Sequence, residues 1–171
     1  YLPRTEGISS TQLRQERPTV NIGIIGTGSI ARRFVPEASF VNSVECVAAW
    51  NPNTAQLADF AKEFGLKATS CIEELYANCD AVYIASPHYT HYSYAKSALE
   101  AGKHVLCEIP FVLKESEAKE LLDMAESKNL VLNLAHKTAH CPAFGHLISL
   151  LRSGTIGQIV DITCSVTTLT T

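Results

Sequence analysis

Residues 20–31, Val20-Asn21-Ile22-Gly23-Ile24-Ile25-Gly26-Thr27-Gly28-Ser29-Ile30-Ala31, join an apolar strand to a glycine turn and the start of a helix. Gly26 permits a sharp turn, Gly28 lets the backbone approach a pyrophosphate, and Ala31 lets the helix pack closely on the strand. The first helical N–H groups then face the phosphates, where the helix dipole favours negative charge. A G-x-G-x-x-A pattern is also found in structural turns, but its place between strand and helix favours a nucleotide site. We therefore expect Gly26, Thr27, Gly28, Ser29 and Ile30 to hold a dinucleotide.

Apolar strands alternate with helices along the rest of the chain. Helices are expected over residues 29–40, 54–64, 91–101 and 114–128, and strands over 44–50, 81–84, 104–107 and 130–134. Such alternation implies parallel pairing through right-handed crossovers, with helices on both faces of the sheet. The fold class is therefore α/β, with a doubly wound parallel Rossmann sheet.

The carboxyl ends of the strands carry the most distinctive residues. In doubly wound sheets ligands bind at that edge. Besides the glycine turn, the residues expected there are Asn51, the run Ser86-Pro87-His88, and the run Glu108-Ile109-Pro110. Fold and ligand site therefore coincide in the prediction.

Composition excludes several functional classes. The net charge is −3 and no basic stripe is present, so neither nucleic acid nor an anionic membrane surface is an expected partner. No apolar run approaches the roughly 20 residues that span a bilayer, and we expect a cytoplasmic protein. The six cysteines contain no C-x-x-C pattern, which favours reduced thiols over a disulfide framework. No metal site is expected either, because Pro142 interrupts the cluster His136, His140, Cys141 and His146 and no carboxylate lies nearby.

Two longer stretches, residues 82–91 (VYIASPHYTH) and 98–110 (ALEAGKHVLCEIP), resemble the glucose-fructose oxidoreductase / inositol dehydrogenase family, Gfo/Idh/MocA. The resemblance implies an NAD(P)-binding Rossmann domain over residues 18–135 and the truncated start of an α/β substrate domain over 136–171. It implies a polyol, sugar or sugar-phosphate substrate, and a homo-oligomer formed through the second domain. Pro87-His88 is similar to the family's nicotinamide-side loop, so His88 and His91 are expected to line the cofactor cleft. Residues 152–160 resemble the family's helix-to-strand entry into the second domain.

The catalytic machinery departs from the family pattern at one position. The family's Glu-Lys-Pro places a lysine near the substrate hydroxyl, whereas this chain has Ile109 there. Isoleucine cannot transfer a proton, and such help is typically worth about 10²- to 10⁴-fold in rate. Lys137 is the nearest substitute, with an exposed surface lysine as the alternative interpretation. The family's other catalytic residues lie farther into the substrate domain, so a non-catalytic nucleotide-binding or assembly domain is a second hypothesis.

The choice between NAD and NADP depends on Asn51, which stands where an acidic residue would bind the adenosine ribose. An amide can bond a ribose hydroxyl without repelling a 2′-phosphate. Pro52 and Asn53 offer that phosphate no positive partner. Arg32 and Arg33, just past the glycine turn, are the candidates for that role, and exposed helix residues are their default interpretation. The sequence therefore favours NAD over NADP.

The first 17 residues do not fit a Rossmann domain. Residues 4–11 (RTEGISST) are similar to the segment that closes the catalytic domain of glycerol-3-phosphate-type cytidylyltransferases, and a linker is the alternative. The chain also begins with Tyr1, so we expect it to be a piece of a longer, bifunctional protein with an upstream nucleotidyltransferase.

Overall fold

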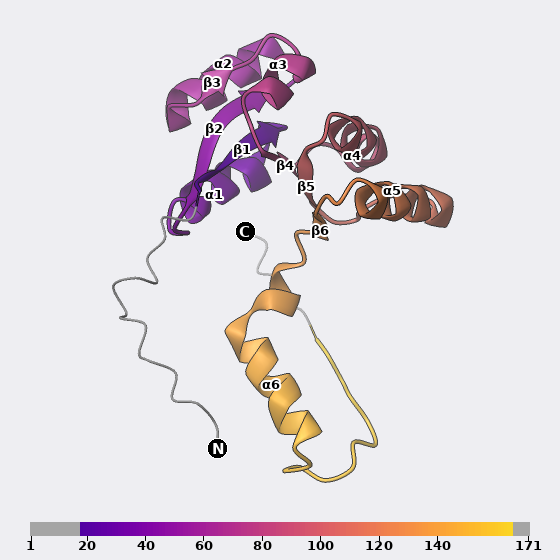
Figure 1. Ribbon diagram of the computed structural model, residues 1–171. Helices are drawn as coiled ribbons and strands as arrows, with labels where there is room; N and C mark the ends of the chain where they lie inside the picture. Colours follow the sequence, from indigo (N-terminus) through magenta and orange to yellow (C-terminus); the bar gives the residue numbers. More distant parts are fainter. Residues whose placement is uncertain (1–17, 166–171) are drawn as a thin grey trace, which may run out of the picture. The chain divides into compact units, whose positions relative to one another are not determined.

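The computed structural model describes residues 18–165, which divide after Ala135 into two units (Figure 1). The predicted cytidylyltransferase-like segment, residues 4–11, lies outside the described residues. The first unit contains every strand of the sheet, and the second unit contains one α-helix and a short 3-10 helix. Each unit is described by itself.

The first unit is a parallel sheet of six strands in the order β3-β2-β1-β4-β5-β6. Its elements in chain order are β1 (Val20–Ile25), α1 (Ser29–Ala38), β2 (Val44–Trp50), α2 (Thr54–Phe64), β3 (Lys67–Ala68), α3 (Ile72–Ala77), β4 (Ala81–Ile84), the 3-10 helix η1 (His88–Thr90), α4 (His91–Glu100), β5 (His104–Cys107), α5 (Glu115–Ser127) and β6 (Leu132–Leu134). The strand order reverses direction at β1 and β4, which is where doubly wound sheets bind ligands. The predicted α/β fold is confirmed.

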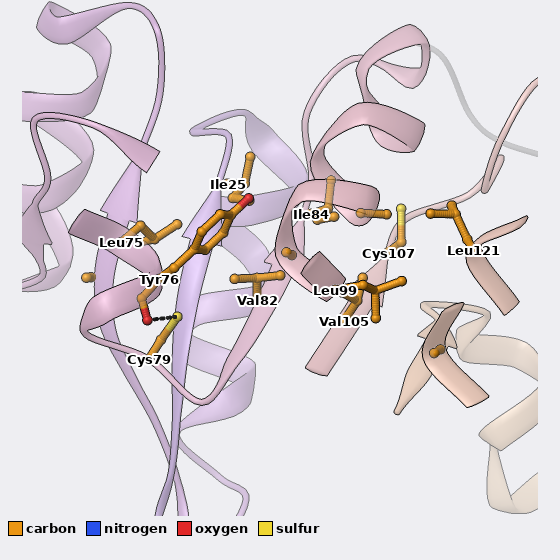
Figure 2. Packing of buried hydrophobic residues seen from close by; sticks show 14 residues of the cluster. Ile25, Leu75, Tyr76, Cys79, Val82, Ile84, Leu99, Val105, Cys107 and Leu121 are labelled. Carbon is orange, nitrogen blue, oxygen red and sulfur yellow. Dashed lines mark hydrogen bonds between the residues drawn. The ribbon is translucent and has the colours of Figure 1, made fainter. Parts of the chain in front are cut away.

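Alternate strand residues face opposite layers of helices. Ile24 and Tyr83 pack with Phe60 of α2 and with α1 on one face of the sheet. Their neighbours in sequence, such as Ile25 and Val82, pack with α3, α4 and α5 on the other face. Figure 2 shows the second layer, where Val82, Ile84, Val105 and Cys107 of the strands meet Leu75 and Tyr76 of α3, Leu99 of α4 and Leu121 of α5. The sheet is therefore covered on both faces, as its apolar strands require.

Most predicted elements occur with bounds close to those expected, and the differences have local causes. The first helix ends at Ala38 rather than residue 40, because the Ser39 hydroxyl donates to the carbonyl of Pro36 and the N–H of Phe40 donates to Glu37, three residues back, in place of the helical bond to Pro36. The helices predicted over 91–101 and 114–128 are each trimmed, to His91–Glu100 and Glu115–Ser127, and the last strand begins at Leu132 instead of residue 130.

Two elements between residues 65 and 81 were not predicted. Strand β3 has only two residues, both exposed, and helix α3 has six. Neither is long enough to display a hydrophobic period. Strand β3 is held by its pairing with β2, and α3 by the packing of Leu75 and Tyr76 in the core.

The second unit contains the 3-10 helix η2 (Lys137–His140) and α6 (Pro142–Arg152). Pro142 stands in the first turn of α6, where its missing N–H has no intrahelical partner to lose. The expected helix-to-strand entry is present only as the helix, because the residues described beyond Arg152 form no strand. A strand needs a neighbour for its backbone hydrogen bonds, and the described residues of this unit supply none. No helix described in residues 18–165 is both long and apolar enough to cross a membrane.

Candidate functional site

The glycine turn joins the carboxyl ends of three strands. The N–H of Gly26 donates to the carbonyl of Trp50 at the end of β2, at 3.0 Å. Gly26 has a φ of +99°, and a Cβ built on it would lie 2.5 Å from the carbonyl oxygen of Ala85, just beyond β4. Only glycine fits this position, because both the backbone conformation and the close approach of β4 exclude a side chain.

Gly28 is different because it faces open space. It is the N-cap residue of α1 with extended backbone, φ −73° and ψ −176°, and a Cβ on it would meet no atom within 4 Å. No side chain caps α1, and its first turn contains no acidic residue. The first N–H groups of this ten-residue helix are therefore unclaimed by a capping side chain, and the helix dipole favours an anion beside them. A glycine cradle and an uncapped helix start are what a pyrophosphate requires.

Asn51, at the end of β2, is held by hydrogen bonds within the protein. Its Nδ2 donates to the hydroxyl oxygen of Thr27 at 3.0 Å and to Oε1 of Gln56 at 3.3 Å. With Nδ2 occupied in this way, its Oδ1 is the atom left for a ligand donor such as a ribose hydroxyl. The neighbouring Arg32 forms an ion pair with Glu63, and its guanidinium lies 5.5 Å from the ring centre of Phe60.

A pocket of about 370 Å³ opens at the carboxyl ends of β4 and β5. Its walls come from the start of α1, from the segments that follow β4 and β5, and from the start of α4, namely Ile30, Ala85, Ser86, His88, His91, Glu108 and Ile109. The two strands are adjacent and parallel, so their exits lie together. Six sequence-predicted residues are thus brought to one pocket, namely Ile30, Ser86, His88, His91, Glu108 and Ile109, whereas Pro87 and Pro110 of the same segments do not line it.

His91 ties the two loops of the pocket together. Its side chain is fully buried, and its two ring nitrogens each lie 2.9 Å from a backbone carbonyl oxygen, that of Ser86 and that of Pro110. Both nitrogens are therefore engaged within the protein. His91 contributes the fixed geometry of the pocket wall, whereas His88 beside it is exposed.

Glu108 is held by a tyrosine that the sequence analysis did not select. The hydroxyl of Tyr83, on β4, donates to Oε1 of Glu108 at 2.5 Å. The ring of Tyr83 is only 2% exposed and is stacked on Phe34 of α1, with 3.7 Å between ring centres. Burial, followed by the hydrogen bond to Glu108, raises the pKa of Tyr83 above its usual range, so the phenol stays a neutral donor. The pair fixes one carboxylate at the pocket.

The remaining predicted residues lie at the start of α1, in the two loops, in the pocket and in the second unit. Ser29 begins α1 beside the glycine turn, and Pro87 and Pro110 belong to the loops after β4 and β5. Ile109 lines the pocket and is 46% exposed, with no group that can exchange a proton. Lys137 lies in the second unit and is exposed.

Comparisons with known proteins agree with this geometry. The model of the Gfo/Idh/MocA oxidoreductase family, described as an NAD-binding Rossmann fold, matches residues 20–136. The chain is 34% identical over 153 residues to dTDP-3,4-didehydro-2,6-dideoxy-alpha-D-glucose 3-reductase of Streptomyces antibioticus, covering 88% of this chain and 47% of that protein. It is 35% identical over 149 residues to scyllo-inositol 2-dehydrogenase (NADP(+)) IolU of Bacillus subtilis, covering 85% of this chain and 45% of that protein.

A solved structure shows the same likeness. The Y186F mutant of KijD10, a 3-ketoreductase from Actinomadura kijaniata in complex with TDP-benzene and NADP, superimposes with a TM-score of 0.76 at 28% identity, covering 82% of this chain and 44% of that one. The chain thus spans about half the length of the curated relatives it matches. Because the family model covers most of the first unit, the chain belongs to the Gfo/Idh/MocA oxidoreductase family and carries its NAD-binding Rossmann domain.

Proposed function

We propose that the first unit binds a nicotinamide dinucleotide along the carboxyl edge of its sheet. The pyrophosphate lies on the uncapped start of α1 beside Gly28, the adenosine extends toward Asn51 on β2, and the nicotinamide enters the pocket at β4 and β5. The observation that carries this proposal is the open space at Gly28 directly beside unclaimed helical N–H groups. Because β1 lies between β2 and β4, the two halves of a dinucleotide centred on β1 can extend to opposite sides, one over β2 and the other over β4.

We further propose that the whole protein transfers hydride to or from a carbon of a polyol, sugar or sugar phosphate. When bound, the cofactor supplies the hydride chemistry. Two relatives of the chain are named as a sugar-nucleotide 3-reductase and an inositol dehydrogenase, and these names support this substrate class. In the pocket Glu108 offers a fixed acceptor for a hydroxyl, His91 contacts both loops, and Ile30 and Ile109 supply apolar walls. Lys137, in the second unit, stays the sequence-based candidate for the proton transfer that Ile109 cannot provide.

NAD is the proposed cofactor in preference to NADP. A 2′-phosphate at the adenosine end needs a cation, and the two arginines of α1 are both engaged, Arg32 with Glu63 and Arg33 with Glu37. The carboxylate of Glu63 beside Arg32 would also repel a 2′-phosphate that approached this arginine. The names of two relatives contain NADP, so the preference for NAD rests on these side chains of this chain and not on the relatives. Competition between NADH and NADPH for the same site tests it, and tighter binding of NADPH would overturn it.

A second function is favoured by Ile109. Ile109 lines the pocket and cannot transfer a proton. A non-catalytic cofactor-binding or assembly domain would tolerate such a residue at this position. Assaying hydride transfer by the full-length protein on a panel of polyols and sugar phosphates separates the two functions. Turnover by the wild type that is not exceeded by Ile109→Lys supports the enzyme. No turnover in the wild type, with turnover gained by Ile109→Lys, supports the binding domain.

The wider setting of the domain is also a proposal. Residues 4–11 support fusion to a glycerol-3-phosphate-type cytidylyltransferase, which release of pyrophosphate from CTP by the full-length protein would test. The six unpaired cysteines support a cytoplasmic location, and the family resemblance supports a homo-oligomer, which light scattering of the full-length protein tests.

The cofactor proposal itself is tested by equilibrium binding. NADH, AMP and nicotinamide mononucleotide are titrated separately into the protein. Saturable binding of NADH that AMP displaces is expected, and absence of binding at millimolar NADH would overturn both the enzyme and the binding-domain hypotheses.

A further inference from the structure

The pocket at β4 and β5 has an unbalanced charge. Glu108 is its one carboxylate, and no lysine or arginine is among the described residues that line it. The titratable groups that share the walls are His88 and His91, and both nitrogens of His91 already face backbone carbonyls. A carboxylate without a basic side chain beside it gives the pocket a negative potential.

This carboxylate is fixed in place. Tyr83 donates to its Oε1 at 2.5 Å, and the N–H of Ile109 lies 3.3 Å from its Oε2. The tyrosine cannot swing away, because its ring is buried and stacked on Phe34. Glu108 is itself half-buried, so salt and water screen its charge less than they screen a surface carboxylate. A preorganised charge acts on a ligand without first being reoriented.

The two redox forms of the proposed cofactor differ in ring charge. The oxidised nicotinamide ring carries a positive charge that the reduced ring lacks, while the rest of the dinucleotide is the same. We infer that Glu108, held by Tyr83 and next to Ile109 instead of a cation, makes this pocket select the oxidised nicotinamide over the reduced one. The inference rests on the proposed function, since it requires the nicotinamide to occupy this pocket.

The selection has a consequence for the cofactor's reducing power. Stabilising the oxidised form lowers the reduction potential of the bound cofactor, and for a two-electron couple a tenfold preference corresponds to about 30 mV. The reduced cofactor bound in this pocket is therefore a stronger hydride donor, and the oxidised cofactor a weaker hydride acceptor, than the same forms free in solution. Reduction of a ketone to a hydroxyl is the direction that this charge arrangement assists.

The test is the ratio of dissociation constants, Kd(NADH)/Kd(NAD⁺), measured by isothermal titration calorimetry. A ratio cancels changes at the adenosine and pyrophosphate ends, which both forms share. Glu108→Gln removes the charge, and Ile109→Lys adds an opposing one at a residue that is 46% exposed and tolerates a longer side chain. Each variant is expected to lower the ratio about tenfold relative to wild type, as a single partly screened charge contact predicts.

Tyr76→Phe is the control for a substitution outside the pocket. It deletes a buried tyrosine hydroxyl that donates to Ser97 at 3.2 Å, and neither residue lines the pocket. Its ratio is expected to equal that of the wild type. An unchanged or increased ratio in both Glu108→Gln and Ile109→Lys would overturn the inference while leaving the proposed function intact. Failure of the wild type to bind either form would overturn both.

Discussion

Replacing each glycine of the turn by alanine should affect a different property: stability at Gly26 and cofactor affinity at Gly28. Gly26→Ala places a Cβ 2.5 Å from the carbonyl oxygen of Ala85 and forces a non-glycine residue to a φ of +99°. The left-handed conformation costs about 1–2 kcal/mol, and overpacking costs about 1–3 kcal/mol. We predict that Gly26→Ala lowers the free energy of unfolding by about 2–5 kcal/mol.

Gly28→Ala should leave stability nearly unchanged and abolish most cofactor affinity. Its backbone angles suit any residue, and its Cβ would meet nothing within 4 Å. The reduced entropy of the unfolded chain contributes about 0.4–1 kcal/mol in favour of alanine. Alanine at an N-cap costs a similar amount, so the net change is within about 1 kcal/mol. The same methyl group occupies the path by which a pyrophosphate would approach α1, and NADH affinity should fall at least about tenfold.

Urea denaturation of both variants, followed by NADH titration of each folded protein, measures the two quantities separately. Wild-type stability together with wild-type NADH affinity in Gly28→Ala would refute the proposed pyrophosphate site, because the open space beside Gly28 would then not be needed for the ligand. Loss of stability in Gly28→Ala equal to that in Gly26→Ala would refute the assignment of distinct roles to the two positions.

Three further predictions concern stability and reactivity. His91→Phe removes a fully buried imidazole whose two nitrogens each lie 2.9 Å from a backbone carbonyl oxygen; it should lower the free energy of unfolding, measured in urea, by about 1–3 kcal/mol, whereas a wild-type midpoint would contradict its role as a bridge between the two loops. Burial raises the pKa of Cys107 to about 12, so mass spectrometry of an alkylation time course at neutral pH should find exposed Cys71 labelled long before it; equal rates would disprove this. Hydrogen bonding to Lys67 lowers the pKa of Glu74 to about 2, so the stability lost in Glu74→Gln should be greatest above pH 4.5 and disappear as the pH falls toward 2, and a pH-independent difference would argue against it.

The sequence was sufficient for features that local chemistry determines. The strand and the turn of residues 20–28, the helix from Thr54 to its end at Gly65, and the strand from Ala81 occur as predicted. Each has its own signal, namely an apolar run, an asparagine N-cap at Asn53 or a glycine in the left-handed conformation. Elements without such signals, β3 and α3, depend on tertiary packing and were not predicted.

The pocket was predictable as a location but not in its contacts. Tyr83 and Glu108 are separated by 25 positions in sequence, and Tyr83 reads as one more apolar residue of a buried strand. The sequence did not give the register between β4 and β5. In the structure Tyr83 pairs with Leu106, and Glu108 lies two residues beyond Leu106 on the same face of the sheet. The bridging role of His91 likewise depends on two loops that meet only in the folded protein.

The most direct test of cofactor binding uses the single tryptophan of the chain, Trp50, whose carbonyl is bonded to Gly26. Emission of Trp50 overlaps absorption by reduced nicotinamide, so bound NADH should quench the tryptophan and emit in its place. We predict saturable energy transfer that AMP reverses in the wild type and that is weakened at least about tenfold in affinity by Gly28→Ala. Energy transfer that never saturates, or that is identical in wild type and Gly28→Ala, would contradict a cofactor bound at the glycine turn.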